Sequence, residues 1–181
     1  MASAGGAIAA QADAVDAAGG SRAAPTQLDA MLVTGTRASN RTQFETLAPV
    51  DVFTKEDITS VESTDLKDVL AQLVPSFVAQ RLPMADGQVF VRPATLRGLS
   101  PDQTLVLVNG TRRHASALVN VNGTVGRGSA AVDLNAIPSG ALDRVEVLRD
   151  GASAQYGSDA IAGVVNLRLK EAREGGGASV T

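Results

Sequence analysis

The stretch that decides the fold is RVEVLRDGASAQYGSDAIAGVVN, residues 144–166. Its first five residues alternate charged and apolar side chains, which is the period of two expected of a half-buried β-strand. Asp150 and Gly151 then mark a turn, and a second alternating run over 163–170 predicts another strand. Tyr156 and the three glycines of the stretch, at 151, 157 and 163, are interpreted as a compact packing motif, because glycine permits positive φ and close backbone approach.

Upstream, short strand and helix patterns follow one another. The run 49–53 alternates as a strand does, and Thr54 is placed to cap a brief helical turn that reaches Ile58. Thr64 is expected to cap a longer helix that must end before Pro75. The apolar stripe of that helix, at i, i+3, i+4 and i+7, consists of Leu66, Val69, Leu70 and Leu73.

The middle of the chain reads as β-structure. Strands are expected at 89–91, 95–99 and 104–108, the last continuously apolar as in a strand covered on both faces. Asn109-Gly110 suits a tight hairpin turn with positive φ at both residues. A long glycine-rich loop, 117–131, and a short helix at 137–142 follow. This irregular mixture predicts a small α+β domain with a mixed sheet, short helices and long loops.

Composition narrows the class of protein. The chain has 181 residues, enough for one ordinary domain and a tail, and its first 24 residues are too poor in large apolar groups to order. With 16 basic against 19 acidic residues the net charge is −3, so nucleic acid is not expected as a partner. No stretch has the roughly 18 apolar residues of a spanning helix.

The sequence motifs do not indicate an enzyme or a cofactor-binding protein. The glycines at 123, 126 and 128 are not followed by the Gly-Lys-Ser/Thr of a phosphate-binding loop. His114, the sole histidine, has no neighbouring metal-ligand set and is predicted to lie on the surface. A triad of His114 with Ser116 and Asp133 would lack a nucleophile elbow. No catalytic residue, cofactor or metal is therefore expected.

The block 144–166 closely resembles the last conserved block of the plug domains of TonB-dependent outer-membrane receptors. Two upstream elements are similar to the same family in order and spacing: the strand ending in Arg97-Gly98, and the strand-turn element 105–112. The resemblance covers roughly residues 28–174. It implies that the domain fills the pore of a β-barrel that lies beyond this chain.

The resemblance also implies a segment that engages the energy-transducing partner, the C-terminal domain of TonB. Residues 28–35 look like this TonB box, and an extended peptide can add as a strand to the partner's sheet edge. The alternative is a strand of the domain's own sheet. The predicted partner-binding residues are Asp29, Ala30, Met31, Leu32, Val33, Thr34 and Gly35.

Two loops are the predicted substrate-facing elements, because the family exposes plug loops toward the extracellular substrate. They are the loops 81–86 and 118–129, and the alternative for each is a plain solvent loop. The predicted substrate-binding residues are Arg81, Asn120, Asn122, Thr124, Arg127 and Ser129.

Three charged residues are predicted to lock the plug in its barrel: Arg97, Glu146 and Arg149. Charges on strands that a barrel surrounds must be paired, since burying them unpaired is costly. In the family, such plug charges face charged groups on the barrel wall. The alternative is a solvated strand face.

One departure from the family pattern leaves the cargo open. Many siderophore receptors carry Gly-Pro where this chain has Asp150-Gly151-Ala152, so a siderophore, a carbohydrate or another nutrient all remain candidates. The alternative function is a freestanding periplasmic ligand-binding or signalling module. The expected divisions are a tail or leader remnant at 1–27, the TonB-box segment and linker at 28–37, the plug at 38–174, and the approach to a barrel at 175–181. The expected location is the Gram-negative outer membrane, with the N-terminus in the periplasm.

Overall fold

The computed structural model describes residues 49–80, 87–121 and 126–171. The expected tail (1–27), TonB-box segment (28–37) and approach to a barrel (175–181) lie wholly outside these ranges, and the expected plug division (38–174) lies partly outside them. Arg81, Asn122 and Thr124 also lie outside them. Within the described ranges, no helix is long and apolar enough to cross a bilayer.

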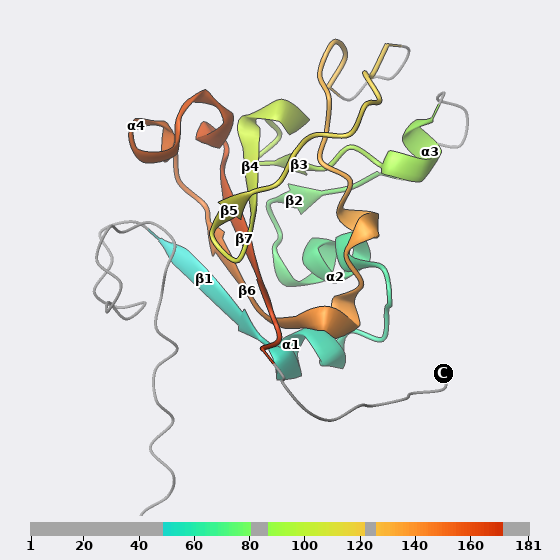
Figure 1. Cartoon of the computed structure of the whole chain (residues 1–181), viewed down its shortest axis with the longest axis vertical. Coiled ribbons are helices and arrows are strands. Elements are labelled where there is room, and N and C mark those ends of the chain that lie inside the picture. The colour runs from blue at the N-terminus through green and yellow to red at the C-terminus, as the bar shows by residue number, and fades with distance from the viewer. Residues whose placement is uncertain (1–48, 81–86, 122–125, 172–181) are drawn as a thin grey trace, which may run out of the picture.

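The centre of the domain is a five-stranded mixed sheet in the order β1-β6-β7-β4-β5 (Figure 1). Its strands are β1 (Val50–Thr54), β4 (Thr104–Val108), β5 (Thr111–Arg112), β6 (Leu142–Leu148) and β7 (Gly163–Leu169). β4 and β7 run parallel, whereas every other neighbouring pair is antiparallel. The α+β class with a small mixed sheet is confirmed.

One face of the sheet carries the larger core, covered by α1 (Lys55–Ser60) and α2 (Leu66–Leu73). The side chains that alternate toward this face on β6 and β7 are aliphatic and, except for the partly buried Leu169, fully buried, so the period-two pattern places them in the core as predicted. Examples are Val145, Val147, Val165 and Leu167.

The opposite face carries a smaller core beneath α4 (Ser153–Tyr156) and the 3₁₀ helix 158–160. Leu105 and Leu107 point to this side while Val106 points to the other, which confirms that β4 is covered on both faces. Gly163 has a φ of 143°, and a Cβ built on it would lie 2.3 Å from the Leu148 carbonyl oxygen. The expected packing role of this glycine is therefore a close backbone approach.

Capping explains where the first helices begin. Thr54 and Asp57 form a reciprocal capping box at the start of α1, as the sequence predicted for Thr54. The expected cap of α2 was wrong by one residue: Asp65, not Thr64, accepts a hydrogen bond from the Lys67 amide at 2.9 Å. A carboxylate at this position also interacts favourably with the positive end of the helix dipole.

The expected strand at 89–91 was wrong, because these residues form the short helix α3 (Gln88–Val91). Their β propensity is overridden by tertiary contacts, which include a hydrogen bond from the Lys67 ammonium to the Val91 carbonyl. The expected strand at 95–99 is shorter than predicted. β3 (Thr95–Leu96) pairs with β2 (Phe77–Val78) and ends where Arg97 and Gly98 take positive φ.

The hairpin turn at 109–110 and the short helix at 137–142 were both expected from the sequence. Asn109 and Gly110 have φ of 50° and 79°, so the hairpin turn between β4 and β5 is confirmed. The helix expected at 137–142 is a single 3₁₀ turn, Ser139–Ala141, preceded by Pro138. In Figure 1, α3 and the segment 114–121 lie at one end of the domain and α1 lies at the other. We call the first the loop end.

Candidate functional site at the loop end

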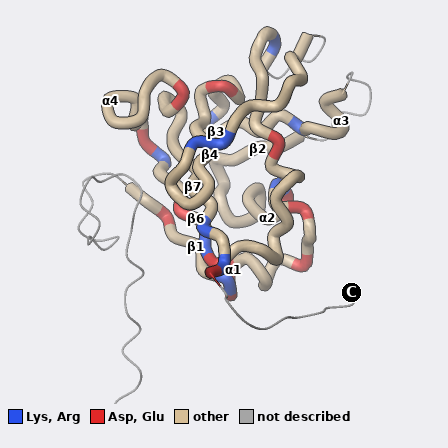
Figure 2. The backbone as a smooth tube through the Cα atoms, in the orientation of Figure 1, with Lys and Arg blue, Asp and Glu red and all other residues tan. Residues whose placement is uncertain are grey.

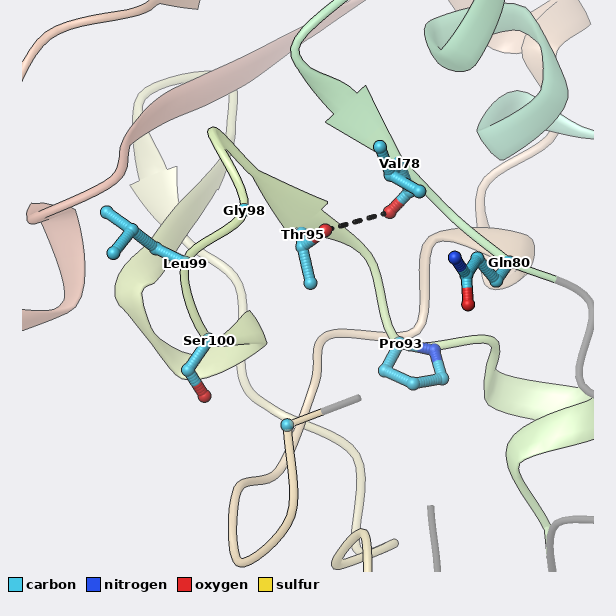
Figure 3. A pocket seen from close by; sticks show the side chains of 8 residues that line it. Val78, Gln80, Pro93, Thr95, Gly98, Leu99 and Ser100 are labelled. Atoms are coloured by element: carbon cyan, nitrogen blue, oxygen red, sulfur yellow. Dashed lines mark hydrogen bonds between the residues drawn. The ribbon is translucent and has the colours of Figure 1, made fainter. Parts of the chain in front are cut away.

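A cavity of about 320 Å³ opens at the loop end, beside the β2–β3 pair (Figure 3). Its described lining is uncharged, with polar groups beside apolar ones. Gln80 immediately precedes the predicted loop 81–86, and Gly126 belongs to the predicted loop 118–129. The two loops proposed to face a substrate are therefore connected to one cavity. The lining consists of Val78, Gln80, Pro93, Thr95, Gly98, Leu99, Ser100 and Gly126.

Local geometry shapes this cavity. Val78 and Thr95 are paired across the strands, and the Thr95 hydroxyl donates to the Val78 carbonyl at 3.4 Å. Gly98, with a φ of 72°, turns the chain after β3. A Cβ on Gly126 would lie 2.4 Å from Cδ of Pro101, so only glycine allows this close approach. Strand pairing and two glycines thus set the cavity walls.

The predicted substrate residues within the described ranges take different places. Asn120 and Ser129 are buried, at 1% and 5% exposure, and their backbones join through the Asn120 amide and the Ser129 carbonyl at 2.9 Å. The Ser129 hydroxyl donates to the Gly126 carbonyl at 2.5 Å. Arg127 is exposed. Among these three, Arg127 presents its side chain to solvent and the other two close the loop.

A buried charge cluster lies under the cavity walls, and the sequence reading did not find it. Arg92 is 4% exposed, and its guanidinium donates to Asp65 at 2.5 Å and to Asp68 at 2.7 Å. It also donates to the Ala79 carbonyl at 2.9 Å. Figure 2 shows basic and acidic positions beside one another around α2. Arg92 is followed by Pro93 but carries no pattern that separates it from a surface arginine.

Lys67 belongs to the same cluster. Its side chain is fully buried, its ammonium donates to the Val91 carbonyl, and it lies 3.7 Å from the Asp133 carboxylate. Desolvation lowers the pKa of Lys67 from 10.5 to about 8, with Asp133 acting in the opposite direction. Lys67 lies on α2, and Arg92 directly follows α3. Their acidic partners are Asp65 and Asp68 at the start of α2 and Asp133 after the loop 118–129.

The three predicted lock residues lie in two environments. Arg97 and Arg149 each have a side chain that is 44% exposed, and Arg97 donates to the Arg149 carbonyl at 3.2 Å. Arg149 also pairs with Asp51 on β1, with Nε and Oδ2 2.6 Å apart. Arg97 lies 3.7 Å from Asp150. These two arginines form a partly exposed charged patch at the end of β6.

Glu146, by contrast, is buried inside the sheet. Its carboxylate accepts from Arg144 Nε at 3.0 Å and from the Asn166 side-chain amide at 3.1 Å. Asn166 also accepts from the Gly110 amide at 3.0 Å, which ties the hairpin turn to β7. Glu146 and Asn166 are direct partners in the β6–β7 register. These two buried polar side chains therefore satisfy one another across the strands.

The residues considered for a hydrolase triad, His114, Ser116 and Asp133, all lie within the described ranges. His114 is exposed, which confirms its predicted surface position. Across the described ranges, His, Cys, Asp and Glu side chains form no group of three that could hold a metal ion. The chemistry available at the loop end is hydrogen bonding and apolar contact within the cavity, next to a buried cluster of ion pairs.

Comparisons with known proteins agree with this arrangement. Residues 42–164 match the family described as TonB-dependent Receptor Plug Domain. The vitamin B12 transporter of Vibrio cholerae is 30% identical over 155 residues, which cover 84% of this chain and 22% of that protein. Its counterpart in Vibrio vulnificus is 32% identical over 123 residues, covering 68% and 18%.

A solved structure shows the same likeness. A variant of the ferric enterobactin receptor of Pseudomonas aeruginosa matches with a TM-score of 0.53 and 32% identity, over 68% of this chain and 18% of that one. The chain spans about a fifth of the length of these relatives.

Proposed function

The chain belongs to the TonB-dependent receptor plug family, and we propose that it gates the pore of an outer-membrane transporter. The observation that carries this proposal is the family match over residues 42–164, which includes β1, β4, β5 and β6 and reaches the start of β7. In this proposal the domain occludes its own barrel, contributes to substrate binding, and moves when TonB pulls on it. Its location is the outer membrane, with the N-terminus in the periplasm.

We place the TonB contact at Asp29–Gly35. A strand-like peptide with free backbone N–H and C=O groups can pair with a sheet edge of the partner. The sequence places this peptide ahead of β1, so tension on it would be passed to the sheet. No bond is made or broken in this role, which fits a family of receptors and transporters better than an enzyme.

We place the substrate at the loop-end cavity. Relatives are named for vitamin B12 and for ferric enterobactin, so small nutrients differ among members of the family. The described lining offers amide, hydroxyl and aliphatic groups, which suit a small molecule with both polar and apolar surface. A siderophore and a carbohydrate both remain candidates for this chain.

We place the contact with the barrel wall at Arg97 and Arg149, whose side chains are partly exposed on one patch. Glu146 is buried, so we propose that it supports the contact with the barrel indirectly, by holding its half-buried partner Arg144. Reversing one charge should weaken the seat of the plug, since a like charge would then face the barrel group. We expect Arg97→Glu to raise ion leakage of the full-length receptor in planar bilayers. Lys55→Glu, on the exposed side of α1, is the matched control, and equal leakage in the two would refute the lock.

The central test uses a peptide of residues 26–40 and the purified C-terminal domain of TonB. We expect measurable binding by fluorescence anisotropy that is lost with Leu32→Pro, because proline removes the N–H needed for strand pairing. Leu32→Ala, which keeps the backbone donor, should retain most of the binding. If the proline and alanine peptides bind equally, the segment does not engage TonB as a strand. The comparisons give no support to a freestanding module.

A further inference from the structure

We propose that Arg92 is a positioning residue of the loop-end cavity, fastening both of its chain walls to α2. This inference deepens the proposed function, because it rests on the cavity being the substrate-facing site. The cavity walls are the segments around 78–80 and 93–95. Between these segments the β2–β3 ladder has only two residue pairs, Phe77 with Leu96 and Val78 with Thr95.

Arg92 extends this short ladder with its side chain. Its Nη2 donates to the carbonyl of Ala79, the residue between the wall residues Val78 and Gln80. Its own neighbour, Pro93, lines the opposite wall. One guanidinium therefore joins the ends of both walls at a point where strand pairing has stopped.

The same guanidinium also attaches the walls to the core. Nη1 reaches Asp65, the N-cap of α2, and Nη2 reaches Asp68 in its first turn. α2 is fixed by buried Leu66, Val69 and Leu70. The three acceptors are shared between two nitrogens of the guanidinium, whereas a lysine ammonium concentrates its donors on one atom.

The backbone at Arg92 supports this assignment. Its φ of 44° and ψ of 81° are left-handed, a conformation that is uncommon for residues with a side chain and further restricted before proline. Such a conformation persists where surrounding contacts hold it. Lys67 contributes from the other side by donating to the Val91 carbonyl.

The test is amide hydrogen exchange, followed by NMR, on the 181-residue chain carrying Arg92→Met. Methionine keeps a long apolar side chain and removes every donor. We expect about tenfold faster exchange at the Arg97 amide, which bonds Ser76, and at the Val91 amide, which bonds Gly87, through easier local opening. Amides of Val147 and Val165 in the central sheet should keep their protection.

Two further variants guard against a general loss of stability. Arg92→Lys should give an intermediate acceleration, because one ammonium can serve only part of the acceptor set. Asp68→Asn removes one charged acceptor and should accelerate the same two amides if Arg92→Met does not fold. Arg112→Met is the matched control, since it removes an exposed paired arginine away from the cavity.

Unchanged exchange at Arg97 and Val91, or equal acceleration in the central sheet, would overturn the positioning role. This outcome is separate from the proposed function. If the peptide of residues 26–40 does not bind TonB, that result counts against the proposed transporter function. The hydrogen-exchange result for Arg92 is unaffected by it.

Discussion

The sheet half of the domain and its loop half are held together in different ways. The sheet half contains β6 and β7, two strands of seven residues whose aliphatic side chains are almost entirely buried. The loop half contains β2 and β3, of two residues each, and the four-residue α3. Its ends are joined to α2 by the buried charges of Lys67 and Arg92.

This difference has a consequence for motion. Each buried valine or leucine contributes roughly 1.5–3 kcal/mol, and the many in the sheet half make that half open only with global unfolding. The loop half contributes Phe77, Ala94 and Leu96 to the larger core, and its ends are held by a few polar contacts whose net contributions are about 1–3 kcal/mol each. Elements that must respond to a ligand are drawn from regions of low local stability. The cavity lies in that half.

The largest expected effect breaks the sheet half directly. Gly163→Val should destabilise the domain by about 4 kcal/mol, because the new Cβ would meet the Leu148 carbonyl at 2.3 Å and φ is 143°. Chemical denaturation measures the change. Gly140→Val is the control, since its Cβ would meet nothing within 4 Å and should change stability by less than about 1 kcal/mol. Similar losses of stability in the two variants would contradict the close approach of Gly163 to the Leu148 carbonyl.

The next effect concerns the polar pair inside the sheet. Asn166→Leu should cost about 3 kcal/mol, because it removes a donor to the buried Glu146 and an acceptor of the Gly110 amide. Urea unfolding compares it with Asn135→Leu, where an exposed side chain donates to the Phe90 carbonyl at 3.0 Å. We expect the second change to cost about 1 kcal/mol or less. Equal costs would show that the sheet tolerates a buried carboxylate with one partner fewer.

The third effect is a pH dependence in the loop half. The pKa of Lys67 is lowered from 10.5 to about 8 by burial, so the unfolded chain binds more protons in this window. The cost of burying the ammonium is fully present below pH 8, and this contribution to stability becomes more favourable as the pH rises toward 10.5. The groups around it are Asp133, Arg92 and Asp65.

Comparing unfolding free energies at pH 7.5 and 10 isolates this contribution. Wild type should gain about 2 kcal/mol relative to Lys67→Met over that interval. Lys55→Met, which removes an exposed ammonium from α1, controls for the loss of one charge. If Lys67→Met and wild type change in parallel, the buried ammonium is not the source of the dependence.

The smallest effect is at the surface. Arg112 pairs with Asp159 and donates to the Tyr156 carbonyl at 2.9 Å, with both charged side chains about half exposed. Arg112→Gln should change stability by less than about 1 kcal/mol, because solvent and salt screen exposed pairs. Thermal unfolding at low and high salt measures it. A loss as large as that of Asn166→Leu would place the ion pair among the main supports of the β5 edge.

Local pattern predicted the elements whose residues decide their own conformation. Period-two alternation placed β6 and β7, and Asn109-Gly110 placed the hairpin turn. Thr54 was expected as a cap because a cap acts within three residues. The strand expected at 89–91 failed for the opposite reason, since Val91 is held by Lys67, 24 residues earlier. The resemblance identified the family but did not show where Arg127 or Asn120 would point.

The sequence by itself determined the plug family and the positions of β1, β4, β6 and β7 along the chain, because motif spacing and alternation are properties of the chain. Only the tertiary structure decided which polar groups meet. The strand pattern of Glu146 fitted either a contact with the barrel wall or a solvated strand face, yet its side chain is buried against Asn166 across the β6–β7 pair. Lys67 and Arg92 likewise become buried because their partners lie on other elements. Burial and pairing depend on packing between distant segments, and no local pattern encodes them.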